Sequence, residues 1–271
     1  MTEPTGPETI HDLPPAEERP PAGPFQRLIG VIFSPGETFA DINRKPTWAF
    51  ALLVAIVASM GSAFLIRARI PDLEQRMEQI MREQIERRLE QQGAPTGPAA
   101  ERQIEQAMSL SRTLFKFSPL FSIATVPIAA LLVAGVFFLV LLMVQADTTF
   151  RKTFSITSWS LMATTLVSNV ATAIVLFLRD PASIDITSPQ GVLMTNLGAM
   201  LGLSSKTTNP VVYATATSVD IFTIWFLILM ALGIEAISRK MSRMKAGVIA
   251  GVLWCVWVGI KVLWAALNPA A

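Results

Sequence analysis

The sequence has little of the residue types on which most enzyme chemistry depends. It contains one histidine, His11, and one cysteine, Cys255, in 271 residues. A single cysteine cannot form an internal disulfide, and the pair cannot make a zinc site of Cys and His ligands. His11 lies in a proline-rich tail, so a Ser-His-Asp triad would lack a histidine in a folded region. We therefore expect no catalytic residues, no metal site and no cofactor, and predict that the protein is not an enzyme.

Charged residues are also scarce, and they are unevenly distributed. They make up 15% of the chain, against about 25% in a soluble domain, and the mean hydropathy is +0.49. The net charge of +2 is too small to indicate nucleic acid as a partner. Only three charges, Asp220, Glu235 and Lys261, fall within five long apolar stretches. These stretches are residues 48–66, 120–144, 157–178, 219–237 and 246–267.

Apolar runs of about 20 residues match the thickness of bilayer hydrocarbon. The sequence therefore predicts an all-α polytopic membrane protein, a five-helix transmembrane bundle within residues 25–267 whose surroundings are the lipid bilayer. The first run begins at residue 48 after a polar leader, which does not fit a signal peptide, so we expect 48–66 to remain as the first span. Residues 1–24 contain seven prolines and are predicted to be a disordered tail.

Residues 25–45 carry apolar side chains at helical spacing on both sides of a break at Ser34. Ser34 could cap the second helix, Pro35 suits its first position, and Glu37 could reach back to complete a capping box. We interpret this segment as two short amphipathic helices at the membrane surface that lead into the first span. A soluble amphipathic connector is the alternative.

Residues 67–118 predict a helical hairpin inserted between the first two spans. A charged helix to residue 92 bears a narrow apolar stripe, residues 93–98 break it, and a second helix runs from Ala99 to Ser118-Pro119. Glu78–Arg82 and Glu83–Arg87 are spaced to pair along the first helix. The charges could simply be a solvated face, or the stripe could bind a partner or self-associate as a coiled coil. Residues 179–217 are too broken to span and could form a short interfacial helix.

Asp220 near the start of the fourth span and Lys261 in the fifth would lie toward the same membrane face, because consecutive spans are antiparallel. Ionisable groups at such depth tend to pair or to line water. We expect an intramembrane ion pair that fixes helix packing, with an ion or proton path as the functional alternative. The third span carries many Ser and Thr side chains, which could hydrogen-bond to neighbouring helices or to their own backbone.

Small residues predict close helix contacts in two spans. Ala51, Ala55, Ser59 and Ala63 recur every four residues in the first span, and Gly247 and Gly251 form a GxxxG pair in the fifth. Pro127 is expected to kink the second span. The short loops 145–156 and 238–245 carry six Lys and Arg residues, against two in 179–217, which favours a cytoplasmic N-terminus and an extracytoplasmic C-terminus.

Four motifs resemble the bacterial branch of the Yip family, membrane proteins named for interacting with Ypt/Rab GTPases. They are Ser34-Pro35-Gly36-Glu37-Thr38-Phe39 before the first span, Thr149-Phe150-Arg151-Lys152 before the third, Asp220-Ile221-Phe222-Thr223-Ile224-Trp225 with Gly233 in the fourth, and Lys245-Ala246 in the fifth. The resemblance implies five spans with a cytoplasmic N-terminus. The Asp-Leu-Tyr-Gly-Pro motif of eukaryotic members is missing, so the resemblance does not extend to GTPase binding.

These observations favour a non-enzymatic integral protein of the bacterial inner membrane. We expect it to act as a scaffold or membrane-organising factor through contacts with other membrane or envelope proteins. The alternative is a small transporter or channel that uses Asp220, Lys261 and the polar face of the third span.

Overall fold

The computed structural model describes residues 20–91, 98–180, 184, 192–203 and 208–268. Ten helices make up most of this part of the chain, and it contains no β-strand. Most of the tail that the sequence predicts to be disordered lies outside the described residues, as does the side chain of Arg87 in the predicted Glu83–Arg87 pair.

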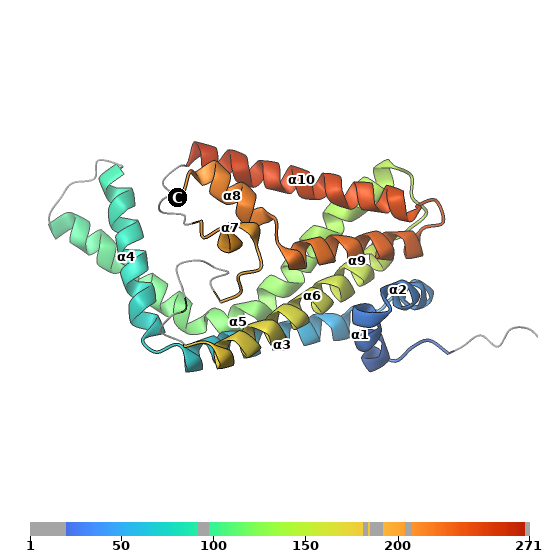
Figure 1. Ribbon diagram of the computed structural model, residues 1–271, viewed down its shortest axis with the longest axis horizontal. Helices are drawn as coiled ribbons and strands as arrows, with labels where there is room; N and C mark the ends of the chain where they lie inside the picture. The colour runs from blue at the N-terminus through green and yellow to red at the C-terminus, as the bar shows by residue number, and fades with distance from the viewer. Residues whose placement is uncertain (1–19, 92–97, 181–183, 185–191, 204–207, 269–271) are drawn as a thin grey trace, which may run out of the picture.

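The long helices run alongside one another as an elongated bundle (Figure 1). Four of them are long and apolar enough to cross a membrane: α3 (Ala49–Arg69), α5 (Pro98–Met143), α6 (Phe150–Leu178) and α10 (Arg243–Leu267). In α5 the candidate span begins at Glu101. A fifth apolar helix, α9 (Ile221–Ile237), has 17 residues and therefore extends only about 25 Å. The predicted all-α polytopic membrane bundle is confirmed, and its fourth apolar stretch forms the shortest of these five helices.

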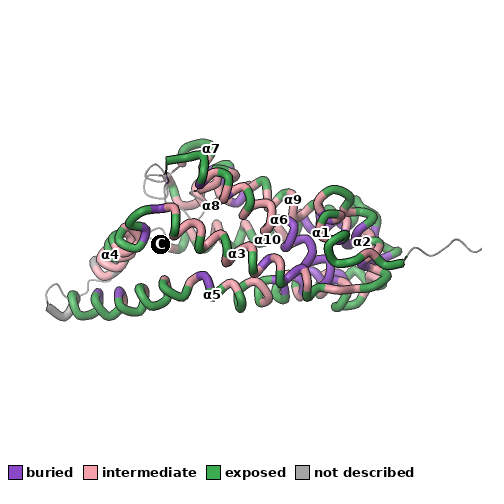
Figure 2. Tube along the Cα trace, turned by 90° about the horizontal axis from the view of Figure 1, so that it is seen from below, coloured by how far each residue is buried: buried purple, intermediate pink, exposed green. Residues whose placement is uncertain are grey.

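The bundle is packed around α6 and α9. Trp159, Ile156 and Met162 of α6 and Met230 and Ile234 of α9 are fully buried. Figure 2 shows that buried residues gather near α1 (Pro24–Phe33) and α2 (Pro35–Arg44), whereas much of α5 and α10 is exposed. Because many of the exposed side chains on α5 and α10 are large and apolar, these surfaces suit contact with lipid.

The second helix of the hairpin and the second span form one continuous helix, α5, which contains Pro119 and Pro127. The predicted break at Ser118-Pro119 is therefore wrong. Pro119 cannot donate a backbone hydrogen bond to the carbonyl of Phe115. Arg67 at the end of α3 supplies the missing donor, because its Nη2 donates to the Phe115 carbonyl and its Nη1 to the Lys116 carbonyl at 3.1 Å. The helix can therefore continue through the proline.

The predicted hairpin is present and consists of α4 (Leu73–Gln91) and the first part of α5, which project beyond the rest of the bundle (Figure 1). Its ion pairs differ from the predicted ones. Glu78 bonds Arg112 of α5 at 2.9 Å rather than Arg82 of its own helix. Arg82 pairs with Glu86 at 2.9 Å. Arg112 across the hairpin competes with Arg82 for the Glu78 carboxylate, and the pair with Arg112 joins α4 to α5.

The segment between α6 and α9 contains two short helices, α7 (Leu197–Met200) and α8 (Pro210–Ser218). An isolated antiparallel bridge joins Asn196 to Asp220. In this bridge the amide of Leu197 donates to the carbonyl of Val219 at 2.9 Å. The bridge holds the polar segment before α7 against the start of α9. Because α9 is short, its start leaves part of this end of the bundle unfilled by helix.

Candidate functional site

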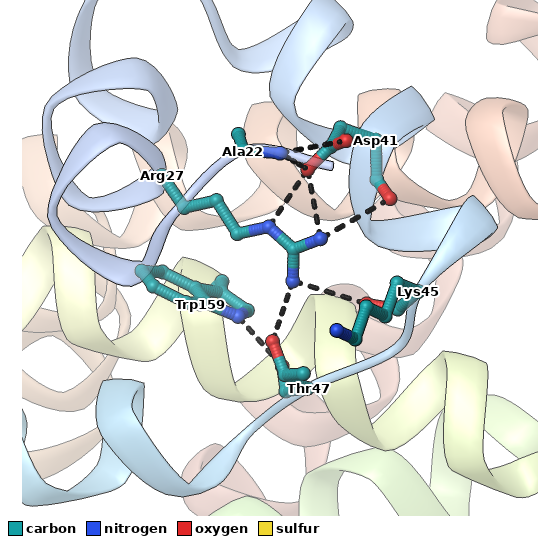
Figure 3. Close-up of polar contacts among 6 residues, drawn as sticks. All are labelled: Ala22, Arg27, Asp41, Lys45, Thr47 and Trp159. Carbon is teal, nitrogen blue, oxygen red and sulfur yellow. Dashed lines mark hydrogen bonds and ion pairs between the residues drawn. The ribbon is translucent and has the colours of Figure 1, made fainter. Parts of the chain in front are cut away.

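A buried arginine joins the amphipathic helices to the bundle (Figure 3). Arg27 of α1 is 2% exposed, and its Nε donates to Asp41 Oδ2 of α2 at 2.8 Å. Its Nη1 donates to the Lys45 carbonyl at 3.0 Å and to Thr47 Oγ1 at 2.5 Å. Trp159 of α6 donates from Nε1 to the Thr47 carbonyl at 2.7 Å. This Arg27 cluster therefore connects α1, α2, the chain before α3, and α6.

Ser34 separates α1 from α2, and Pro35 occupies the first turn of α2 as predicted. The predicted capping box is wrong, because the Ser34 side chain makes no capping hydrogen bond and Glu37 is exposed. Ser34 also ends α1, since its amide donates to the Gly30 carbonyl at 2.7 Å, which leaves it at φ −140° and ψ 59°. An N-cap side chain acts from extended backbone. Thr38 Oγ1 instead donates to the Ser34 carbonyl at 3.0 Å.

The outer face of α1 is apolar. Phe25, Ile29 and Phe33 recur every four residues and are 73%, 58% and 79% exposed, whereas Arg27 and Val31 are buried. The helix thus has a polar anchor on its inner side and a row of large apolar side chains on its outer side. A row of this kind suits the boundary between head groups and acyl chains.

A polar pocket lies at the end of the bundle away from the Arg27 cluster, between the second halves of α3 and α6, the end of α8, the start of α9 and the middle and second half of α10. Its volume is about 440 Å³. The lining comes from α3, α6, the segment before α7, and α8, α9 and α10. Its polar members include Ser62, Ser168, Asn169, Thr172, Thr195, Thr217, Ser218, Asp220 and Lys261. The structure therefore brings the polar face of the third span together with both intramembrane charges.

Asp220 and Lys261 line this pocket but make separate contacts. Asp220 is the N-cap of α9, where Oδ1 accepts from the Phe222 amide at 2.8 Å, and Oδ2 accepts from Thr195 Oγ1 at 2.6 Å. Lys261 Nζ donates to Ser218 Oγ at 2.9 Å. Among the ion pairs of the described residues, none joins Asp220 to Lys261. The expected direct ion pair is therefore replaced by two separate sets of hydrogen bonds. The amides at the start of α9 compete with Lys261 for the Asp220 carboxylate.

The hydroxyl groups of α6 mostly bond to their own helix. Thr157, Thr164 and Thr172 each donate to the carbonyl four residues earlier, at 2.9, 3.1 and 2.9 Å. This satisfies polar groups inside an apolar bundle without a partner helix. Ser160 is different, because its buried Oγ has no hydrogen-bond partner within the described part of the chain.

A scan against protein-family models matches the Yip1 domain over residues 29–266. The chain belongs to the Yip1 family. No curated protein and no solved structure matches the chain. The match extends from within α1 to the last turn of α10, so the polar pocket lies wholly within the Yip1 domain. Arg27 lies just before the matched residues, and its partners Asp41, Lys45 and Thr47 lie inside them.

The motifs that resemble the Yip family lie mainly at helix starts. Thr149 is the N-cap of α6 and accepts from the Lys152 amide at 3.4 Å, as Asp220 is the N-cap of α9. Gly233 permits a close approach of α9 to α6, because a Cβ there would lie 3.0 Å from Ile156. In this Yip1-family chain, these motif residues fix where helices begin and how closely they pack.

The two rows of small residues have different surroundings. Ala51 and Ala55 of α3 are fully buried, whereas Ser59 and Ala63 further along the helix are half-buried. Gly247 and Gly251 of α10 have no atom within 4 Å of the position of an added Cβ. Within the described part of the chain, the predicted glycine packing face is therefore not used. Ala246 and Ala250, one position earlier, are the small residues of α10 that pack in the bundle.

The loops beside α2 hold two further polar contacts. Ser238 Oγ donates to Asp147 Oδ1 at 2.5 Å, and this hydrogen bond lowers the pKa of the Asp147 carboxyl below its usual value. Glu235 pairs with Arg243 at 2.9 Å across the turn between α9 and α10. Within the described part of the chain, no three His, Cys, Asp or Glu side chains are grouped as metal ligands.

Proposed function

We propose that this Yip1-family membrane protein is a non-enzymatic scaffold that contacts other membrane or envelope proteins through its projecting hairpin. The observation that carries the proposal is the hairpin itself, which extends beyond the helices that fill the bundle (Figure 1). A helix pair that only connected two spans would not need this length, since Arg67 at the end of α3 already contacts Ser118 at 3.3 Å.

The inner surface of the hairpin suits a helical partner. A groove of about 320 Å³ between α4 and α5 has Met77, Met81 and Met108 in its lining, with Glu78 and Arg112 beside them. Methionine side chains adapt to partners of different shape. The charges at the margin would contribute orientation and specificity.

We also propose that the protein lies in the inner membrane of a bacterium with its N-terminus in the cytoplasm. The basic short loops before α6 and between α9 and α10 meet α2 and the start of α3 at one end of the bundle. Arg151 Nη2 donates to the Pro46 carbonyl at 3.2 Å, and Lys240 Nζ donates to the Gln145 carbonyl at 3.0 Å. Clustered Lys and Arg in short loops mark the cytoplasmic side. The hairpin would then lie on the opposite side of the membrane.

Removal of residues 68–117 tests the scaffold proposal. Arg67 and Ser118 are in contact, so a short Gly-Ser linker can join them while the spans keep their positions. We expect the shortened protein to insert normally and to lose its crosslinked partners in membranes. A Glu78→Arg variant should weaken the same crosslinks, because it breaks the pair with Arg112 that joins α4 to α5 and reverses a charge at the margin of the groove. An unchanged crosslinking pattern after the deletion would refute the role of the hairpin.

One observation favours a small transporter or channel as a second candidate. The polar pocket gathers Asp220, Lys261 and hydroxyl groups of α6 at the depth of the spans. Ionisable groups at this depth often belong to substrate pathways. Replacement of Asp220 by Asn together with Lys261 by Met should abolish flux in proteoliposomes while insertion persists. Flux that is absent from the unaltered protein would leave the scaffold as the proposed function.

A further inference from the structure

An apolar groove on the lipid-facing side of the bundle adjoins the polar pocket. This groove, of about 440 Å³, lies between α5, α9 and α10 and has Leu132, Val136 and Leu253 in its lining. Leu132 and Val136 are 66% and 49% exposed, so the groove opens to the outside of the bundle. The two cavities share Thr223, Trp254 and Trp257 in their linings, so they adjoin at these residues, and a ligand that reaches past these side chains would occupy both.

The polar pocket offers one cation and one anion that do not bond each other. Lys261 uses one N–H on Ser218, and an ammonium group has three. Within the described residues, Lys261 therefore has N–H groups left for a phosphate. Asp220 Oδ2 accepts one hydrogen bond, from Thr195, and a carboxylate oxygen can accept two. The carboxylate can therefore also receive an N–H donor from a ligand.

The tryptophans mark the level at which such a ligand would change from polar to apolar. Trp254 and Trp257 line both cavities. Tryptophan prefers the boundary between head groups and acyl chains, because its ring is apolar and its N–H is polar. The polar pocket and the apolar groove meet at these two side chains, which resembles this boundary within the protein.

We propose that the pocket and the groove together bind a zwitterionic phospholipid with a primary ammonium head group. Its phosphate lies at Lys261, its ammonium group at Asp220, and an acyl chain lies in the groove beside Trp254 and Trp257. A zwitterion fits better than an anionic lipid, because its ammonium group can pair with Asp220, whereas an anionic lipid brings no cation to this carboxylate. The site is at the opposite end of the bundle from the Arg27 cluster and does not depend on the hairpin.

Calorimetric titration of the full-length protein in detergent tests this assignment. The probes are dioctanoyl phosphatidylethanolamine, dioctanoyl phosphatidylglycerol, glycerophosphoethanolamine and inorganic phosphate. We expect the first to bind most tightly. Lys261→Met should weaken its binding about tenfold, the loss expected for one hydrogen bond to a charged group. Lys245→Met, which removes an exposed lysine from the other end of α10, is the matched control and should leave binding unchanged.

A second variant tests the groove separately from the head-group site. Ala129 is an exposed lining residue of the groove, so Ala129→Phe fills the groove without entering the core. We expect it to weaken binding of the dioctanoyl lipid and to leave binding of glycerophosphoethanolamine unchanged. If glycerophosphoethanolamine or phosphate binds as tightly as the lipid, the site takes a small anion or zwitterion and the proposal is overturned. Tighter binding of phosphatidylglycerol than of phosphatidylethanolamine also overturns it. So does an affinity for the dioctanoyl lipid that is the same in the Lys261→Met and Ala129→Phe variants as in the unaltered protein.

Discussion

Replacement of Arg27 by Met should release α1 and α2 from the bundle. The guanidinium group is 2% exposed and bonds Asp41, the Lys45 carbonyl and the Thr47 hydroxyl. Methionine keeps the length and apolar stem of the side chain but supplies no donor. Asp41 would then retain its charge beside an apolar group, and the chain before α3 would lose its contact with α1.

The size of the effect follows from the surroundings of Asp41. Loss of one partner from a buried ion pair costs about 3–5 kcal/mol. The Asp41 side chain is 16% exposed and also accepts from the Ala22 amide at 3.2 Å, so part of its charge stays stabilised. We therefore expect a value near the lower limit, about 3 kcal/mol. This corresponds to an increase of about a hundredfold in the equilibrium constant for local opening.

Hydrogen exchange of the purified protein in nanodiscs measures this opening. Amides of residues 24–45 should exchange about a hundredfold faster in the Arg27→Met variant, while amides in the middle of α6 should not change. Lys45→Met is the control, because it removes a neighbouring positive charge whose side chain is exposed. Arg27→Met combined with Asp41→Leu should recover most of the protection, since no unpaired charge remains. Unchanged exchange in the single variant, or a double variant as open as the single one, would refute the reasoning.

Two further predictions concern packing and pH. Gly233→Val should lower the melting temperature, because even a Cβ at this position would lie 3.0 Å from Ile156 and overpacking costs about 1–3 kcal/mol. Gly247→Val is the control, and it should leave the melting temperature unchanged because an added Cβ there meets no neighbour. The lowered pKa of Asp147 means that its ionised form stabilises the folded state above about pH 4, and this contribution is lost as the pH falls through the lowered pKa. Melting curves of Asp147→Asn should therefore depend less on pH in the acid range, and an unchanged dependence would contradict the role of the Ser238 hydrogen bond.

The helices and their apolar character could be predicted because they depend on local sequence. Runs of apolar residues indicated the membrane helices, and the break at Ser34-Pro35 indicated where α1 and α2 separate. The outcome at Pro119 depended on a residue far away in sequence. A proline predicts the end of a helix, yet Arg67, about fifty residues earlier, supplies the donor that Pro119 lacks. No local pattern around Pro119 contains that information.

The polar contacts within the bundle could be predicted only in part, for the same reason. Arg27 is the single charged residue of α1, but its partner Asp41 lies on the next helix. Asp220 and Lys261 line one pocket, although the expected ion pair is not among the ion pairs of the described residues. Their actual partners, Thr195 and Ser218, lie in a connection whose path the sequence does not fix. A signal for Asp220 existed, because an aspartate directly before an apolar helix is a common N-cap.

The two ends of the bundle are filled differently, and the length of α9 explains why. At about 25 Å, this helix is shorter than the hydrocarbon core of a bilayer, which is about 30 Å thick. Its C-terminal part packs against α2 and α6, where the side chains are buried, and its start at Asp220 lies at the polar pocket. The missing turn of helix is replaced by a connection that carries hydroxyl groups. A cavity with charges at this depth is costly if it faces hydrocarbon, so water or a polar head group must fill it, and the adjoining apolar groove favours the head group of a lipid.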